Sequence, residues 1–176
     1  TRHFSGAFFF LLLLFFAGMI AFEITGSFWV AALTVLSMFA IPRLLGQAFG
    51  NLKDIPFAAG YSAGIYLIIR FIKELPKVKW STVLSLAFVI AFTNSVRIGG
   101  LILFAYLGLA MVVYFISKPF LLKYVFSTKL CLVRIMGQGL VILLVGYFAG
   151  LLFWPYALRD VFQHPLESLH LMEHYK

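Results

Sequence analysis

The chain has 176 residues, of which 63% are hydrophobic and 11% are charged, and its mean hydropathy is +1.03. A soluble globular domain carries about 25% charged residues, so this balance excludes that class and predicts a protein that lies in a lipid bilayer. The net charge of +8 does not indicate nucleic-acid binding, because the basic residues are spread between apolar runs instead of clustering on a polar surface.

Uncharged apolar stretches mark the candidate membrane spans. A spanning helix takes roughly 20 residues, and the stretches at 4–22, 28–49, 55–72 and 136–154 have suitable lengths. We interpret the first stretch as a span, because it lacks the Lys-rich leader and the small-residue cleavage site of a signal peptide. A further stretch, residues 81–114, would form a helix of about 51 Å. That length exceeds the hydrocarbon core of about 30 Å, so this stretch must fold back.

The sequence from Asn94 to Gly100 is the predicted site of this reversal. It contains an amide, the charged Arg97 and two adjacent glycines, which weaken a helix and require partners for the freed backbone groups. We therefore expect two short spans, 81–95 and 100–117, joined by a tight turn. The predicted fold is all-α: one polytopic transmembrane helix bundle over residues 1–176 with about six spans.

The loops predict the orientation of the chain. Alternating spans place loops 23–27, 73–80 and 118–135 on one side of the membrane and 50–54, 94–100 and 155–176 on the other. The first side carries most of the basic residues: Lys73, Lys77, Lys79, Lys118, Lys123, Lys129 and Arg134, with Arg70 just inside the preceding span. The positive-inside rule makes that side cytoplasmic and the opposite side periplasmic or outer.

Small residues at a spacing of four recur in two of the predicted spans. Gly60 precedes Gly64, and Gly146 precedes Gly150. This spacing is typical of close helix packing in membranes.

Polar side chains gather on the predicted outer side. They are Arg43, Gln47, Asn51, Lys53, Asp54, Asn94, Arg97 and, in the tail, His164, Glu167, His170, Glu173 and His174. Asp54 stands where a span begins, just before Pro56, and two interpretations remain open for it. It can cap the helix and pair with Lys53, or it can face a cavity and bind a divalent metal ion or a hydrogen-bonded ligand.

Arg97 and the tail histidines have similar alternatives. In a turn with two glycines, the guanidinium of Arg97 can present a rigid fork to a lipid phosphate, or it can snorkel to fix the depth of the helix. His170 and His174 stand one helical turn apart and could bind a metal with Glu167. The segment 155–176 reads equally well as an outer interfacial helix.

The order of several short motifs resembles the C-type integral-membrane glycosyltransferases. The closest branch is the bacterial one, similar to dolichyl-phosphate-mannose protein mannosyltransferases and aminoarabinose transferases. The motifs are Arg2-His3-Phe4-Ser5-Gly6-Ala7, Thr25-Gly26-Ser27, Ile41-Pro42-Arg43-Leu44-Leu45-Gly46, Asn51-Leu52-Lys53-Asp54-Ile55-Pro56-Phe57 and Ser95-Val96-Arg97-Ile98-Gly99-Gly100-Leu101. The resemblance covers the whole chain, which we expect to be a fragment without the family's N-terminal catalytic loop and C-terminal part.

The resemblance implies an enzyme of the bacterial inner membrane. Its partner would be a polyprenyl-phosphate-linked sugar, and its acceptor a lipid, glycan or protein on the outer face. Asp54 would position a divalent metal or the donor phosphate, although Ile55 stands where many members have a second acid. Arg97, and less directly Lys53, would contact the phosphate, with Asn51, Asn94, His170 and His174 as supporting outer residues. The catalytic residues stay unassigned, because the acceptor-activating acid is expected upstream of Thr1 and the isolated chain is expected to be inactive.

A function of another class fits the same composition. A small polytopic transporter or an accessory subunit of a membrane complex would share the hydropathy, the packing glycines and the re-entrant turn. The two halves of the sequence show no convincing repeat, and no run of intramembrane acids suggests a proton relay.

Overall fold

The computed structural model describes residues 2–120, 125 and 127–152. His170, His174 and the predicted interfacial segment 155–176 lie outside the described residues, as does the end of the predicted span 136–154. Within the described residues the chain is helical and has no strands. The elements in chain order are α1 (Arg2–Thr25), α2 (Phe28–Phe39), α3 (Pro42–Gly50), α4 (Asp54–Glu74), α5 (Trp80–Val96), the 3₁₀-helix η1 (Ile98–Leu101), α6 (Ile102–Ser117) and α8 (Lys129–Leu151).

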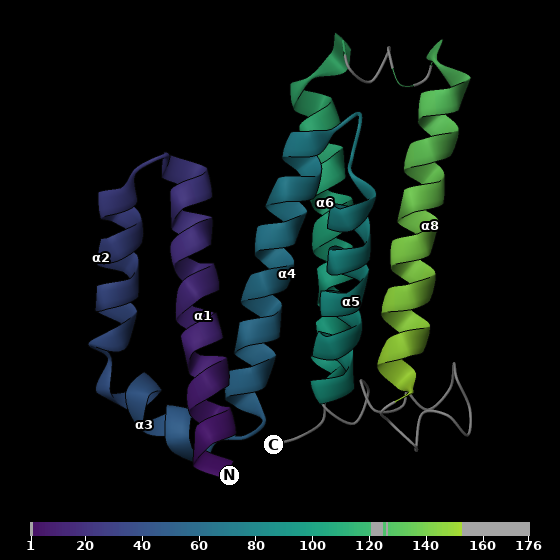
Figure 1. Ribbon diagram of the computed structural model, residues 1–176. Coiled ribbons are helices and arrows are strands. Elements are labelled where there is room, and N and C mark those ends of the chain that lie inside the picture. The colour runs from purple at the N-terminus through teal and green to yellow at the C-terminus, as the bar shows by residue number, and fades with distance from the viewer. Residues whose placement is uncertain (1, 121–124, 126, 153–176) are drawn as a thin grey trace, which may run out of the picture.

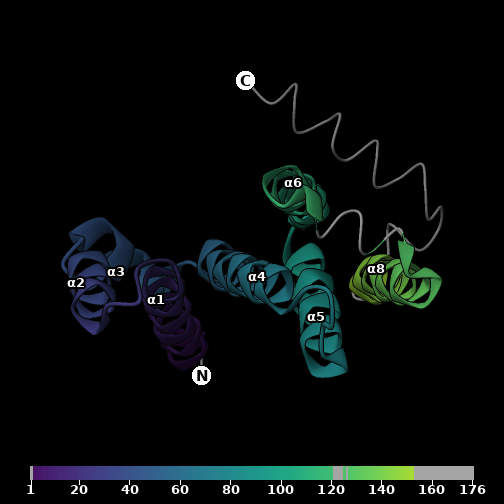
Figure 2. The ribbon, with the colours of Figure 1, turned by 90° about the horizontal axis from the view of Figure 1, so that it is seen from above.

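The long helices run up and down beside one another (Figure 1). Seen along their axes, α2, α1, α4, α5 and α8 follow one another in a row, and α6 lies to one side of it (Figure 2). The closest packing joins α5 to α8, α1 to α4 and α4 to α5, while α6 contacts α4. A buried core including Phe71, Leu86, Ile90, Leu103 and Ile142 lies among α4, α5, α6 and α8.

The predicted all-α helix bundle is confirmed, and the chain is an integral membrane protein. Helices α1, α4, η1 with α6, and α8 are long and apolar enough to cross a bilayer. The bent pair α2 and α3 adds a fifth candidate, and α5 is a shorter apolar helix. The predicted reversal between 95 and 100 is present, because α5 ends at Val96 and η1 turns the chain into α6.

The predicted span 28–49 is not one straight helix. It breaks after Phe39 into α2 and α3, whose axes differ by 69°. The cause is Pro42, which disfavours helical geometry at the residue before it. Ile41 is accordingly extended, with φ −79° and ψ 108°, and Pro42 starts α3 near its first position.

The prediction that residues up to 135 form a loop before the last span is also wrong. Helix α8 begins at Lys129, so Arg134 lies within the helix. The charged residue is tolerated in the helix because its guanidinium has a partner. It donates a hydrogen bond of 3.1 Å to the carbonyl oxygen of Val78.

The predicted packing glycines lie where helices approach closely. A methyl group on Gly60 would lie 2.6 Å from Oγ1 of Thr93, and one on Gly64 would lie 2.8 Å from a methyl of Leu103. On α8, a methyl group on Gly146 would lie 2.9 Å from the ring of Phe104. These glycines therefore let α4 and α8 pack against α5 and α6.

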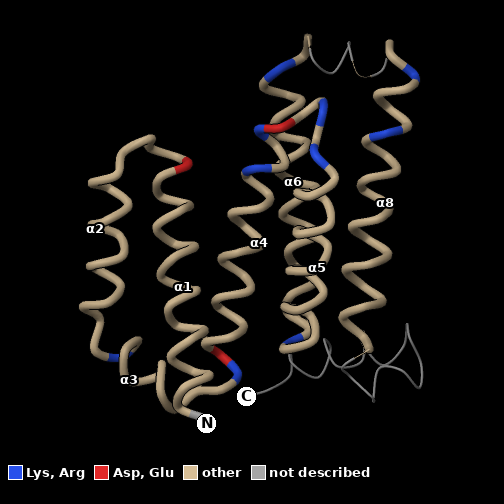
Figure 3. Tube along the Cα trace, in the orientation of Figure 1, with Lys and Arg blue, Asp and Glu red and all other residues tan. Residues whose placement is uncertain are grey.

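Charged residues lie towards the two ends of the bundle, and the middle of the helices carries none (Figure 3). We call the end where α4 finishes and α5 starts the basic end; its basic residues are Arg70, Lys73, Lys77, Lys79, Lys118, Lys129 and Arg134. The other end, where α4 starts and α5 finishes, holds Asp54 and Arg97, and we call it the Asp54 end.

Candidate functional site

The start of α4 is shaped by Asn51. Its side-chain Oδ1 accepts hydrogen bonds from the backbone N–H groups of Lys53, at 3.2 Å, and Asp54, at 2.9 Å. Its Nδ2 donates to the Asp54 carboxylate at 2.5 Å. Asp54 is the first residue of α4, so its negative charge lies at the positive end of the helix dipole.

Arg97 comes to the same place from the end of α5. Its N–H donates to the carbonyl of Thr93 at 3.0 Å, and its own carbonyl accepts a hydrogen bond of 3.0 Å from the N–H of Gly100. These bonds hold the turn at which α5 ends and η1 starts. The Arg97 guanidinium forms an ion pair with the Asp54 carboxylate, so the two motifs singled out in the sequence meet in space.

The Asp54–Arg97 pair is open to its surroundings. The Arg97 side chain is 44% exposed and the Asp54 side chain 45%. Exposed ion pairs contribute about 0.2–1 kcal/mol to stability, so this one adds little to holding α4 and α5 together. Its guanidinium has five N–H donors, so it can bind another anion while Asp54 stays in contact.

One predicted alternative for Asp54 is wrong. The pairing of Asp54 with Lys53 does not occur, because the Asp54 carboxylate is held by Asn51 and Arg97. Lys53 itself occupies the N-cap position of α4, without a side-chain capping hydrogen bond. Its side chain is exposed.

Asn94, expected as an outer support, belongs to the interior. It is only 7% exposed, and its Nδ2 donates a hydrogen bond of 3.2 Å across to the carbonyl of Gly146 on α8. The residue is thus adjacent to the Arg97 turn in sequence but faces the neighbouring helix.

The described residues at this end do not fit a divalent metal. Within the parts of the chain that the structure describes, no group of three or more His, Cys, Asp or Glu side chains comes together. Asp54 supplies a single carboxylate, which is already bound to a guanidinium. Divalent hard cations need several oxygen ligands, so we assign no metal to these residues.

Sequence reasoning missed a polar contact at the basic end. Gln138 on α8 is fully buried, and its Nε2 donates a 3.0 Å hydrogen bond to Val78, whose carbonyl also accepts from Arg134. The nearby Glu74 carboxylate accepts from the Thr82 hydroxyl at 2.9 Å. The signal in the sequence was an amide one turn after an arginine in an apolar run. These contacts fix the loop between α4 and α5.

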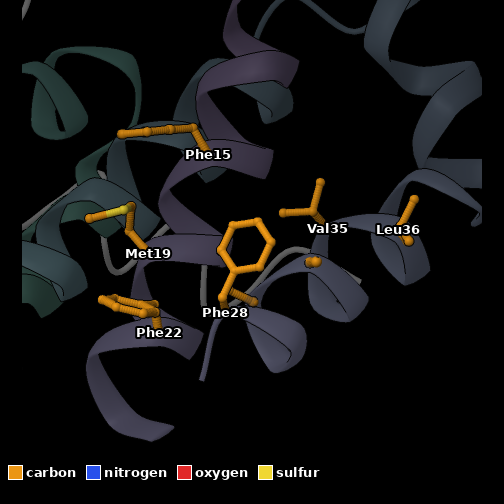
Figure 4. A pocket seen from close by; sticks show the side chains of 9 residues that line it. Phe15, Met19, Phe22, Phe28, Val35 and Leu36 are labelled. Atoms are coloured by element: carbon orange, nitrogen blue, oxygen red, sulfur yellow. The ribbon is translucent and has the colours of Figure 1, made fainter. Parts of the chain in front are cut away.

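An apolar groove lies elsewhere, away from Asp54 and Arg97. Helices α1 and α2 enclose a groove of 630 Å³ lined by Phe15, Gly18, Met19, Phe22, Phe28, Ala31, Ala32, Val35 and Leu36 (Figure 4). None of these side chains has a polar group that could bind a phosphate or act on a substrate.

The fold and this end of the bundle define a class: an integral membrane protein of helical hairpins with an exposed Asp–Arg pair at a helix start. Comparisons with known protein families, curated proteins and solved structures found no match to the chain. The function must therefore be argued from the residues themselves.

Proposed function

We propose that the chain is the phosphate-handling part of a membrane glycosyltransferase, which moves a sugar from a polyprenyl-phosphate donor to a lipid, glycan or protein acceptor. The Asp54 end would face the periplasmic or outer side, because the opposite end carries the basic loops. The proposal rests on the motif resemblance and on one structural observation, the half-exposed Arg97 guanidinium beside the start of α4.

The geometry supports binding of a phosphate at this position. A guanidinium donates two parallel hydrogen bonds to phosphate oxygens. The exposed Lys53 ammonium lies next to Asp54 in the chain and adds positive charge. The helices carry no charged residues in their middle (Figure 3). A phosphate on a hydrocarbon chain could therefore bind at this end of the protein while the hydrocarbon chain lies in the bilayer.

The reaction would be a displacement at the anomeric carbon. The acceptor hydroxyl oxygen forms the new bond to that carbon, and the bond to the phosphate oxygen breaks with its electron pair on the polyprenyl phosphate. The acceptor proton passes to a carboxylate that we do not assign among the described residues. Arg97 stabilises the charge that develops on the leaving phosphate, an effect that is strong in a water-poor site, and Asp54 holds the guanidinium in position.

The test is sugar transfer by the full protein in membranes with a polyprenyl-phosphate sugar donor. We expect Arg97→Ala and Asp54→Asn each to abolish transfer while the protein remains folded, because the ion pair contributes little stability. The chain offers a matched control in the Lys73–Glu23 pair, which has a distance of 2.6 Å and a Lys73 side chain 53% exposed. Lys73→Met and Glu23→Gln should retain transfer.

Two results would contradict the proposal. Unchanged turnover in both Arg97→Ala and Asp54→Asn would leave only a structural role for the pair. Substrate movement across vesicles by a protein that transfers no sugar would favour a transporter, the alternative that the sequence left open.

A further inference from the structure

Asn94 is a polar side chain that connects the Arg97 turn to α8. Its Nδ2 bonds to the Gly146 carbonyl at 3.2 Å, whereas its Oδ1 is buried and has no hydrogen-bond partner among the described residues. An unsatisfied buried acceptor costs about 1–3 kcal/mol. Asn94 therefore adds little to the global stability of the fold, whereas its bond to Gly146 holds the turn locally against α8.

Backbone packing around Asn94 is close on two sides. A methyl group on Gly100 would lie 2.5 Å from Oδ1 and 2.7 Å from the backbone nitrogen of Asn94. A methyl group on Gly150 would lie 2.8 Å from Cβ of Asn94 and 3.1 Å from the carbonyl oxygen of Ala91. Asn94 is thus held between η1 and α8, so a shift of either element moves it.

The backbone hydrogen bonds of the turn lie next to Asn94 in the chain and hold the backbone of Arg97. Arg97 donates to Thr93, the residue before Asn94, and Gly100 donates back to Arg97. We infer that Asn94 is a positioning residue, which fixes the turn against α8 and so sets where Arg97 presents its guanidinium to a phosphate. The phosphate part of this inference rests on the proposed function; the positioning part does not.

The experiment compares Asn94→Leu with Gln138→Leu in the purified protein. Gln138 is the matched control because it is also buried, also donates one hydrogen bond to a backbone carbonyl, and also has a side-chain oxygen without a partner among the described residues. It lies towards the basic end, so its loss leaves the turn untouched. Gly150→Ala serves as a second variant. It keeps the Asn94 amide, but its added methyl group would press on Cβ of Asn94.

Hydrogen exchange of the Arg97 and Gly100 amides gives a readout without any ligand. We expect exchange to be about tenfold faster in Asn94→Leu and in Gly150→Ala, which corresponds to about 1.4 kcal/mol of lost local stability. It should be unchanged in Gln138→Leu. The second readout is the apparent Kd for a short-chain polyprenyl phosphate in nanodiscs, which should rise about tenfold in the first two variants only.

The outcomes separate the two claims. If the wild-type protein binds no polyprenyl phosphate, the proposed function fails, while faster exchange in Asn94→Leu still supports positioning. If Asn94→Leu and Gly150→Ala leave both amide exchange and the Kd unchanged, the inference about Asn94 is overturned. Equal changes in Gln138→Leu would also overturn it, because they would show a general loss of packing.

Discussion

The substitution Gly60→Ala tests whether α4 and α5 are held together by close backbone approach. The added methyl would lie 2.6 Å from Oγ1 of Thr93 and 3.1 Å from the ring of Phe92. Thr93 is fully buried, and its hydroxyl donates to the Val89 carbonyl at 2.7 Å. A β-branched side chain has few rotamers and the hydroxyl is held by this bond, so we expect α4 to shift.

The magnitude follows from two opposing effects. Replacing a helical glycine by alanine stabilises a helix by about 0.8–1.0 kcal/mol, whereas overpacking a filled interior costs about 1–3 kcal/mol. Gly108 in α6 has no atom within 4 Å of its added methyl, so Gly108→Ala receives only the stabilising effect. Since the helix propensity cancels between the two variants, we expect Gly60→Ala to be less stable than Gly108→Ala by about 1–3 kcal/mol.

The assay is reversible unfolding in mixed micelles by titration with SDS. A further variant, Thr93→Ala, removes the clashing Oγ1, and combining it with Gly60→Ala should recover part of the loss as a favourable coupling. Equal stability of Gly60→Ala and Gly108→Ala would refute the reasoning, because it would mean that α4 and α5 do not approach as closely as the structure shows.

Three other predictions need separate measurements. Asp54→Asn should change the free energy of unfolding by less than about 1 kcal/mol, because both members of the ion pair are nearly half exposed; a larger loss in the same titration would make the pair structural. Pro42→Ala should allow α2 and α3 to join, since only the proline forces Ile41 out of helical geometry, and the distance between spin labels at Thr34 and Phe49 should lengthen; an unchanged distance would assign the bend to packing. In a Cys131→Ser background, an impermeant thiol reagent added outside intact cells should label a cysteine at Leu52, which is 42% exposed, and should spare one at Lys77; the reverse pattern would invert the proposed orientation.

The sequence was sufficient to predict the helical class and the reversal at the Arg97 turn. Both predictions depend on local chemistry: an apolar run too long for one span, and a charge with two glycines in its middle. The packing glycines were predictable for the same reason, since spacing along one helix fixes which residues share a face. The break before α3 was also marked locally, by Pro42, but hydropathy alone extended the span across it.

Pairing across the bundle could not be predicted. The choice of Arg97 over Lys53 as the partner of Asp54 depends on where α5 ends relative to α4, which is a tertiary property. The burial of Asn94 likewise depends on the approach of Gly150 on α8. We predicted a loop at Arg134 because a charged side chain favours contact with water. In the structure the backbone carbonyl of Val78, in the loop between α4 and α5, accepts a hydrogen bond from it.

The two ends of the bundle hold their ion pairs differently, and this leads to a last prediction. At the basic end, Lys73 donates to both the carboxylate and the carbonyl of Glu23, each at 2.6 Å. At the Asp54 end, the Asp54 carboxylate does not depend on Arg97 alone. It also accepts a hydrogen bond from Asn51 and is stabilised by the dipole at the start of α4. An incoming phosphate can therefore share the five N–H donors of the Arg97 guanidinium with an Asp54 that stays in place.

Asp54→Asn and Arg97→Ala should consequently fail in different ways. Arg97→Ala removes the phosphate contact, so the apparent Kd for a polyprenyl phosphate should rise at least about tenfold, the loss of one charge-assisted hydrogen bond. Asp54→Asn removes a negative charge close to the phosphate, so binding should be as tight as in the wild type or tighter, while transfer is lost because the guanidinium is no longer held in position. A carboxylate repels a phosphate, so weaker binding in Asp54→Asn would show instead that Asp54 is needed to hold Arg97 in its binding position.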